Sequence, residues 1–330
     1  MGHALVGEDV RVLILSSGKA GHEANCLGVA EALGAPCDKR VVEPRNFFAS
    51  LAPYGPIDPK DRPDRRGSIM AEPFPAIAIA CGRRTVPYLR ALKRLGGARV
   101  FTVFLQDPRY GRGEFDLIWT PEHDGLAGPN VITTLTSPHP FSKARLAALR
   151  ADPDPRIVAL PRPRAAILLG GVSAAHDFSK ADLARMSDAV KAIVRQGFSV
   201  MATPSRRTMP TLIEAAREGL AEADPTHVFL WDGAGDNPYG QMLAHADAIL
   251  VTGDSVNMMG EAVATGAPVH IFELSGGGGR IDAFVAELVR RGVARPFKDR
   301  LESFAYQPIN SSATIAEAIA ARFNAAKHRP

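Results

Sequence analysis

Residues 249–272 constrain the fold of this chain more than any other stretch of its sequence. An apolar run ends at Val251, and a polar turn, a helix-like stretch and a break at Gly266 and Pro268 separate it from a second apolar run. This is the order strand, turn, helix, strand. Strands that are joined through a helix are parallel, and helices cover both faces of a parallel sheet. The segment therefore predicts an α/β fold.

The same alternation of apolar runs and helix-like stretches recurs in both halves of the chain. The predicted strands of the first half are residues 10–15, 39–42, 76–80, 100–105, 117–120 and 131–134. Those of the second half are residues 165–169, 199–202, 227–231, 248–251 and 269–272. The clearest helices are residues 22–33, 85–95, 181–196 and 314–323. This pattern predicts two Rossmann-like, doubly wound domains.

A chain of 330 residues fits two domains of ordinary size. The segment 152–164 is rich in proline and charge, which is typical of a linker. We therefore expect an N-terminal domain over residues 1–152 and a C-terminal domain over residues 153–310. A last helix within residues 311–330 could pack back on the N-terminal domain.

An insert at residues 44–75 interrupts the alternation. It contains Phe47, Leu51 and Tyr54 together with a lysine and several arginines, and it shows little periodicity. One interpretation is a mobile surface loop. The other is a membrane-facing patch, whose aromatic side chains enter the headgroup layer while its arginines meet anionic lipid.

Composition narrows the class of protein. With 46% hydrophobic and 22% charged residues, and no apolar stretch long enough to span a bilayer, the chain is typical of a soluble globular protein. The N-terminus lacks the pattern of a secretory signal, and the three cysteines show no metal-ligand or disulfide spacing, so we expect a cytoplasmic protein. The net charge of +4 suits an anionic substrate or an anionic membrane surface, but it is too small to indicate nucleic acid.

Two common nucleotide-binding patterns are missing. The loop at residues 16–21 does not match the Gly-x-Gly-x-x-Gly pattern of dinucleotide-binding domains, and it lacks the Gly-Lys-Ser/Thr of a P-loop. We therefore expect neither NAD nor ATP by these routes, and no cofactor. Asp232 and Asp236 do not form a compact Asp-x-Asp motif, so we also predict no obligatory divalent metal.

Two glycine loops are candidates for ligand binding. The first contains Gly18 and Gly21, the second contains Gly170 and Gly171, and each follows a strand and precedes a helix. Ligands of α/β proteins bind at the carboxyl ends of parallel strands. The two loops are therefore expected to face one cleft between the domains.

His22 and Asp107 are the candidate catalytic bases. His22 lies near the start of the first helix, where the positive end of the helix dipole favours a neutral imidazole that can accept a proton. Asp107 follows a buried strand at the same edge of the first sheet, and it could accept a hydroxyl proton or orient a base. The alternatives are a solvated or helix-capping histidine and a turn aspartate before proline.

The polar turn of the opening segment predicts a phosphate site. It contains Thr252, Asp254 and Ser255, followed by Asn257, and it precedes a helix whose N-terminal N–H groups and dipole favour an anion. Glu261 lies further along the same helix and could reach a pair of ribose hydroxyls. Together these residues indicate a nucleoside-diphosphate site.

Three further residues could contact the diphosphate. Ser205 and Arg206 follow a strand, and paired arginines at the carboxyl end of a strand suit a diphosphate. Arg280 comes directly after a run of four glycines and could close over a phosphate. The alternatives are a solvated basic turn and a simple connector.

Over nearly its whole length the chain resembles the mitochondrial-fission family of plants and its bacterial counterparts. The resemblance rests on the motifs Ser16-Ser-Gly-Lys-Ala-Gly-His-Glu-Ala-Asn25, Gln106-Asp-Pro-Arg109, Thr203-Pro-Ser-Arg-Arg-Thr208, Asp236-Asn-Pro-Tyr239 and Val251-Thr-Gly-Asp-Ser-Val-Asn-Met-Met-Gly-Glu-Ala262. It implies the GT-B glycosyltransferase fold. The plant member of the family also implies a different role, that of an adaptor on the outer mitochondrial surface that recruits a dynamin-like division protein.

A more distant similarity implies chemistry. The loop with Gly18, Gly21 and His22 is similar to a loop of the glycosyltransferase that adds N-acetylglucosamine to the lipid-linked peptidoglycan precursor, and Gly170-Gly-Val-Ser is similar to its second glycine loop. Glu261 matches the acidic residue that such enzymes place on the nucleotide ribose. The turn Thr252-Gly-Asp-Ser is similar to one in the non-hydrolysing epimerases of UDP-N-acetylglucosamine, which share the fold.

The sequence departs from those glycosyltransferases at Arg280-Ile-Asp, where they have glutamines that recognise the sugar. The donor sugar is therefore not implied. The resemblances together predict a metal-independent glycosyltransferase of the GT-B fold that binds a nucleotide sugar, with an acceptor from the cell envelope and a peripheral place at the inner face of the membrane. The alternatives are an epimerase of the same fold and a non-catalytic adaptor with a protein partner.

Overall fold

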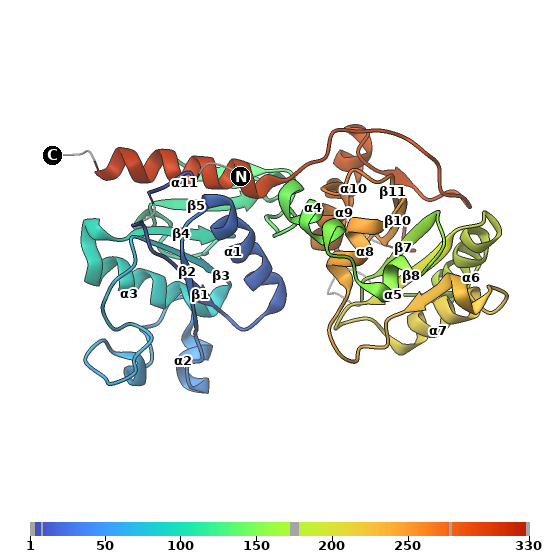
Figure 1. Cartoon of the computed structure of the whole chain (residues 1–330). Helices are drawn as coiled ribbons and strands as arrows, with labels where there is room; N and C mark the ends of the chain where they lie inside the picture. Colours follow the sequence, from blue (N-terminus) through green and yellow to red (C-terminus); the bar gives the residue numbers. More distant parts are fainter. Residues whose placement is uncertain (1–3, 8, 172–177, 277–278, 328–330) are drawn as a thin grey trace. The chain divides into compact units, whose positions relative to one another are not determined.

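The computed structural model describes residues 4–7, 9–171, 178–276 and 279–327 of the chain. Its internal contacts divide the chain into two compact units (Figure 1). Unit 1 comprises Met1–Pro140 and Ser311–Pro330, and unit 2 comprises Phe141–Asn310. The two units are described separately below.

Unit 1 is built on a sheet of six parallel strands in the order β2-β1-β3-β4-β5-β6. The strands are β1 Val12–Ser16, β2 Cys37–Val41, β3 Ile77–Cys81, β4 Phe101–Leu105, β5 Leu117–Pro121 and β6 Val131–Thr134. The helices are α1 Ala20–Leu33, α2 Asn46–Leu51, α3 Val86–Gly96 and α11 Ser311–Lys327. The direction in which strands are added reverses between β1 and β3. In open α/β sheets such a reversal is where ligands bind.

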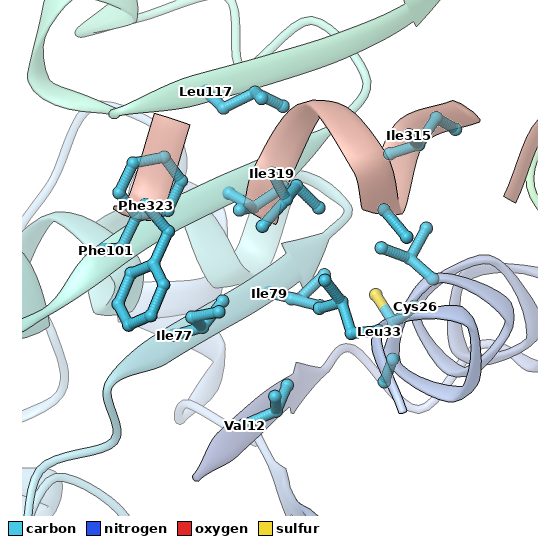
Figure 2. Close-up of a cluster of buried hydrophobic side chains, with 14 of the residues drawn as sticks. Val12, Cys26, Leu33, Ile77, Ile79, Phe101, Leu117, Ile315, Ile319 and Phe323 are labelled. Carbon is cyan, nitrogen blue, oxygen red and sulfur yellow. The ribbon is translucent and has the colours of Figure 1, made fainter. Parts of the chain in front are cut away.

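The inner strands of unit 1 are mostly apolar because helices cover both faces of the sheet, whereas the edge strand β2 is polar and largely exposed. Every residue of β1, β3, β4 and β5 is buried. The helix α11, red in Figure 1, packs against α1 and β6. Figure 2 shows its side chains Ile315, Ile319 and Phe323 directed at the strands and at Cys26 and Leu33 of α1. A segment from the far end of the chain thus completes the core of unit 1.

Unit 2 repeats the plan with six parallel strands in the order β12-β11-β10-β7-β8-β9. The strands are β7 Arg164–Leu169, β8 Ser199–Pro204, β9 Val228–Leu230, β10 Ala248–Thr252, β11 Val269–Phe272 and β12 Arg295–Pro296. The helices are α4 Lys143–Ala151, α5 Pro155–Val158, α6 Lys180–Arg195, α7 Pro210–Gly219, α8 Tyr239–His245, α9 Val256–Val263 and α10 Arg280–Arg290. Here the order reverses between β7 and β10, as in dinucleotide-binding domains.

The prediction of two Rossmann-like, doubly wound domains is confirmed. The division between them lies at Pro140 and Phe141 rather than at residues 152–153. The reason is that α4 packs on α8, where the Arg150 guanidinium donates a hydrogen bond to the Ala244 carbonyl at 2.7 Å. The segment 152–164, which we expected to be a linker, therefore lies inside unit 2.

Two local expectations also change. The helix α1 begins at Ala20, so Gly21 belongs to its first turn and not to the preceding loop. The insert 44–75 is not irregular throughout, because it contains α2 and buries Ala49 and Met70. The expected cleft between the domains concerns their relative placement and stays a prediction.

Candidate functional site

Four of the predicted residues of unit 2, Gly170, Gly171, Thr252 and Asp254, meet where the strand order reverses. The Gly170 backbone N–H, just after β7, donates a hydrogen bond to the Thr252 hydroxyl at the end of β10, at 2.7 Å. The next N–H, that of Gly171, donates to the Asp254 carboxylate at 2.8 Å. The glycine loop and the polar turn, which are far apart in the sequence, thus form one structure at the carboxyl edge of the sheet.

Both glycines are required by the closeness of this contact. A Cβ atom on Gly170 would lie 2.2 Å from the Asp254 carboxylate oxygens, and one on Gly171 would lie 2.1 Å from the Arg207 carbonyl oxygen. Real Cβ atoms do not approach other atoms so closely. Glycine therefore allows the backbone of this loop to approach its neighbours, as in many phosphate-binding turns.

Thr208 connects the loop that follows β8 to the glycine loop that follows β7. Its hydroxyl contacts the carbonyl oxygens of Leu169, at 2.8 Å, and of Gly170, and it accepts the Ser205 N–H at 2.7 Å. Ser205 is thus held in a turn, whereas Arg206 beside it is exposed. Sequence reasoning named Ser205 and Arg206 but missed Thr208. Its signal was the hydroxyl that ends the Ser-Arg-Arg-Thr motif.

The turn before α9 supplies a helix cap and a buried carboxylate. The Ser255 hydroxyl accepts the Met258 N–H at 3.4 Å, so it caps α9. Asn257 is half-buried in the first turn of the helix. Asp254 is only 3% exposed, and within the described part of the chain its second carboxylate oxygen, Oδ1, has no hydrogen-bond partner. A buried acceptor without a donor is unfavourable, so Oδ1 is a place where a ligand N–H or O–H would be stabilised.

Glu261 is paired with a tyrosine that sequence reasoning did not connect to it. The Tyr239 hydroxyl, at the start of α8, donates a hydrogen bond to the Glu261 carboxylate. Burial raises the pKa of Glu261 to about 7, and the hydrogen bond from Tyr239 lowers it again in part. The pKa of Tyr239 is raised by burial and by the neighbouring carboxylate, so the phenol keeps its proton and remains the donor. The edge of Phe141 contacts the Tyr239 ring.

A second loop of unit 2 is anchored near the start of α10. The Asp182 carboxylate is fully buried and accepts hydrogen bonds from the N–H and hydroxyl of Ser275, at 2.9 and 2.7 Å. The pKa of Asp182 is lowered because these and other donors outweigh the effect of burial. Arg280, the predicted phosphate ligand, is exposed at the first position of α10.

A pocket of about 520 Å³ lies beside this loop within unit 2. Its walls come from the carboxyl ends of β10 and β11 and from α10, and they include Gly253, Glu273, Asp282 and Val285. This volume is within the range of small-molecule sites. The pocket is therefore adjacent to the turn that contains Thr252 and Asp254, at the same edge of the sheet.

In unit 1 the site residue His22 lies at the corresponding reversal, between β1 and β3. The Ser17 hydroxyl and the Nδ1 atom of His22 are 2.8 Å apart. A Cβ atom on Gly82, which follows β3, would lie 2.5 Å from the same Nδ1, so only glycine leaves room for the imidazole. Burial, with the nearby Lys19 charge, lowers the pKa of His22, and the imidazole is therefore neutral at pH 7.

The loop before α1 is held by its own polar groups. Gly18 has a φ of 75°, which favours glycine, and its N–H donates to the Ser16 hydroxyl at 3.0 Å. The Ser16 hydroxyl in turn donates to the Glu23 carboxylate. These bonds fix the backbone that carries Ser17 and leads into the first turn of α1, where Gly21 and His22 lie.

The geometry favours His22 over Asp107 as the base. The Asp107 carboxylate forms an ion pair with Arg112 at 2.7 Å and accepts the Arg109 N–H at 2.9 Å. These contacts lower its pKa, and a stabilised carboxylate is a weak proton acceptor. Gln106 and Arg109, on either side of Asp107, have φ values of 123° and 61°, so this strand end is strained.

The described residues contain no group of three or more His, Cys, Asp or Glu side chains placed to hold a metal ion. In the same part of the chain, no helix combines the length and the apolar character needed to cross a bilayer. The absence of a metal requirement stays a prediction.

Comparison with known proteins places the chain in a family. Residues 20–323 match the family model described as mitochondrial fission ELM1. The chain belongs to the mitochondrial fission ELM1 family. This match covers both units and all of the predicted site residues except Gly18.

Two curated proteins are similar in sequence to this ELM1-family chain. The mitochondrial fission protein ELM1 of Arabidopsis thaliana is 30% identical over 272 residues, which cover 74% of this chain and 63% of the plant protein. An uncharacterised protein of Rickettsia prowazekii is 29% identical over 164 residues, 47% of this chain and 45% of that protein. The matched part is therefore less than two thirds of each relative.

Solved structures show the fold. The UDP-GlcNAc 2-epimerase from Methanocaldococcus jannaschii superimposes with a TM-score of 0.55, over 96% of this chain and 99% of the epimerase, at 12% sequence identity. So low an identity speaks only for the fold. Together with the two parallel six-stranded sheets, this similarity confirms the predicted GT-B fold.

Proposed function

We propose that this ELM1-family protein is a metal-independent glycosyltransferase of the GT-B fold that binds a nucleotide sugar on unit 2. The observation that carries the proposal is the close contact of Gly170 and Gly171 with Thr252 and Asp254 where the strand order reverses. Glu261 on α9, the helix that follows Asp254, adds a carboxylate for a ribose. The solved epimerase of the same fold is named for UDP-GlcNAc, which supports a nucleotide sugar as ligand.

The diphosphate would lie against helix N-termini and arginines. The start of α9 offers the N–H groups after Ser255. Arg206, in a loop, and Arg280, at the start of α10, are exposed on the same unit. The leaving nucleoside diphosphate develops negative charge, which such dipoles and cations stabilise without a metal. The Ser255 hydroxyl, already used as a cap, would contribute little beyond its cap.

Asp254 suits a sugar better than a phosphate. Its carboxylate would repel a diphosphate placed against it, whereas its buried Oδ1 lacks a donor. A hydroxyl of the donor sugar would supply that donor. We therefore assign Asp254 to the sugar, and we leave the diphosphate to the helix N-terminus.

The acceptor would bind at the carboxyl edge of the sheet of unit 1, with His22 as base. A neutral imidazole can take the acceptor proton through Nε2 if Nδ1 carries the hydrogen. That hydrogen would be donated to the Ser17 hydroxyl, 2.8 Å away. Ser17 would thus orient the ring and fix its tautomer. The deprotonated acceptor oxygen then attacks the anomeric carbon, and the bond to the diphosphate breaks.

A non-catalytic adaptor is the second candidate. It is favoured by membership of a family whose plant relative is named a mitochondrial fission protein. An adaptor has no need of a neutral histidine packed against Gly82 or of a half-buried Glu261–Tyr239 pair. These features support the enzyme, and the experiment below separates the two.

The test is a product screen by mass spectrometry. The full chain is incubated with pooled nucleotide sugars and a cell-envelope extract, and we expect free nucleoside diphosphate together with a sugar-modified acceptor. His22→Ala should lower turnover by a factor of about 100 to 10,000, with little change in donor affinity. His227→Ala is the matched control, because His227 also contacts a serine hydroxyl, that of Ser199 at 3.2 Å, but at the amino end of β8.

Other outcomes would count against the transferase. A sugar isomerised while still attached to its nucleotide would identify an epimerase. No change in any pool, combined with tight binding of a division protein, would identify an adaptor. Equal turnover in His22→Ala and wild type would remove His22 from the mechanism.

A further inference from the structure

One end of unit 1 exposes a group of large apolar side chains. Phe47 and Leu51 on α2 are 67% and 38% exposed, and Tyr54 just after it is 64% exposed. Tyr110, 42% exposed, comes from the loop after β4, and its ring packs against that of Tyr54 with centroids 5.3 Å apart. We call these four residues the α2 surface. Figure 1 shows α2 at the end of unit 1 where the light-blue loop also lies.

The backbone beneath the α2 surface is held firmly. The fully buried Asp58 carboxylate accepts hydrogen bonds from both the backbone N–H and the guanidinium of Arg45, at 2.7 to 3.1 Å. The Tyr88 hydroxyl donates to Asp61 at 2.6 Å, and the Arg83 guanidinium donates to the Ala52 carbonyl at 2.8 Å. The interpretation of the insert as a mobile loop therefore does not fit its contacts.

This arrangement holds apolar side chains in water. Burial of a Phe or Tyr side chain is normally favourable, and monomeric proteins seldom gather several exposed ones on a fixed surface unless a partner covers them. Hydrogen bonds within unit 1, such as those of Asp58 and Asp61, hold these side chains exposed to water despite the unfavourable free energy. Aromatic side chains that are held exposed in this way indicate a binding partner that buries them.

The charges around the α2 surface indicate the chemistry of that partner. Lys60 is exposed, and its Nζ donates to the Glu43 carbonyl at 2.6 Å, close to the start of α2. Arg83 contacts the carbonyl of Ala52, and Arg109 precedes Tyr110. Residues 43–75 contain five acids and five bases, but two of the acids, Asp58 and Asp61, are buried beneath the surface. All five bases are exposed, against three exposed acids, so the exposed charge of this stretch is cationic on balance.

We propose that the α2 surface docks unit 1 on a bilayer that contains anionic phospholipid. Aromatic side chains with a polar end prefer the boundary between headgroups and acyl chains, and arginine and lysine at the rim meet the lipid phosphates. The rest of the chain stays in water. The docking does not depend on the glycosyltransferase proposal, because none of the residues of the α2 surface belongs to the sites described above.

The experiment measures binding of the full chain to vesicles. Wild type should co-sediment with phosphatidylglycerol–phosphatidylcholine vesicles and much less with phosphatidylcholine alone, and salt should weaken the binding. The double substitution Phe47→Ser with Tyr54→Ser should lower the partition coefficient at least about ten-fold, since two exposed rings are lost. Lys60→Gln and Arg109→Gln should each lower it about five-fold, and only on the anionic vesicles.

Leu95→Ser is the matched control. Leu95 is 42% exposed on α3, away from the α2 surface, so its substitution should leave binding unchanged. Phe47→Trp gives a direct probe, because its fluorescence should shift to the blue only when anionic vesicles are added. Thermal unfolding checks that each variant is folded.

Three results would overturn the proposal. One is equal and negligible sedimentation of wild type with both kinds of vesicle. Another is unchanged binding when both aromatic residues are replaced. The third is a self-association, seen by light scattering, that disappears with the double substitution while vesicle binding persists, because a second copy of the chain would then cover the surface.

Discussion

Glu261 is the residue at which burial and hydrogen bonding act in opposite directions. Burial raises its pKa to about 7, and the Tyr239 hydroxyl stabilises the charged form. Tyr239 lies on α8 and Glu261 on α9, and the strand β10 separates the two helices in the sequence. Hence the sequence could point to Glu261 by its place in a helix, but not to Tyr239, whose role depends on the tertiary structure.

We predict that Glu261→Gln weakens nucleoside-diphosphate binding by roughly 1.5–3 kcal/mol, about ten- to a hundred-fold, because a charge-assisted bond to the ribose is lost. Calorimetry measures the affinity and thermal unfolding measures the stability. Since the Glu261 carboxyl is already costly to charge in its half-buried position, the melting temperature should not fall. A variant that loses stability but keeps its affinity would make Glu261 a structural residue.

Tyr239→Phe separates orientation of the carboxylate from contact with the ligand. Loss of the phenol removes the hydrogen bond that lowers the pKa of Glu261, so the carboxyl should be more protonated at pH 7. Nucleotide affinity should therefore drop near neutral pH and recover in more basic buffer. A loss of affinity that is the same at every pH would contradict this role.

His270 gives a pH dependence of stability in unit 2. Its ring is buried in β11 and accepts the Glu302 N–H at 3.0 Å, and burial lowers its pKa from 6.5 to about 4. Between pH 6.5 and about 4, His270 therefore stays neutral in the folded protein, whereas it binds a proton in the unfolded chain. Stability present above pH 6.5 should be lost progressively as the pH falls towards 4.

We predict that the free energy of unfolding falls by roughly 2 kcal/mol between pH 7 and about 5 because of this group. Urea unfolding of wild type and His270→Gln at the two pH values measures it. The glutamine can still accept the Glu302 N–H but does not titrate, so its pH dependence should be flatter. Parallel curves for the two proteins would show that His270 is not the cause.

At the scale of elements, the apolar runs of the sequence predicted most of the strands, and the glycine loops predicted where a helix follows the first strand of each unit. The strand positions were predictable because a buried parallel strand is apolar throughout, as β3 and β10 are. The helix α4 was missed, and the proline-rich segment after it was taken for a linker. The prolines and charged residues of this segment form helix caps and turns, as Asp154 does before α5. Only the packing of α4 on α8 shows that the segment belongs to unit 2.

The helix α11 gives a prediction at this scale. Ile319 is fully buried between α11 and the strands of unit 1, so Ile319→Ala should lower the stability of that unit by about 2–5 kcal/mol. Glu317→Ala, on the exposed side of the same helix, should change it by less than about 0.5 kcal/mol. Urea unfolding of the two variants measures the difference. A similar effect of both would mean that α11 contributes little to the core.

At the scale of the whole molecule, unit 2 is one continuous stretch that contains all the predicted nucleotide-binding residues except Gly18 and Gly21, whereas unit 1 is closed by the end of the chain. The fold, and the place of the glycine loop and the polar turn at the carboxyl ends of strands, followed from the sequence, since parallel strands bring these ends together. Thr208, the unpartnered Asp254 oxygen and the Ser17–His22 contact did not, because each depends on atoms from separate segments or on exact side-chain placement.

The central claim is that the close contact at Gly170 shapes a nucleotide-sugar site whose diphosphate lies against the start of α9. Calorimetric titration of the full chain with the common nucleoside diphosphates tests it most directly. The account predicts heat of binding for at least one of them with wild type, and its loss in Gly170→Ala, whose Cβ would lie 2.2 Å from the Asp254 carboxylate. Gly113→Ala, at a glycine with no atom within 4 Å of the added Cβ, should bind like wild type. No heat with any diphosphate, or equal binding by folded Gly170→Ala, would contradict the claim.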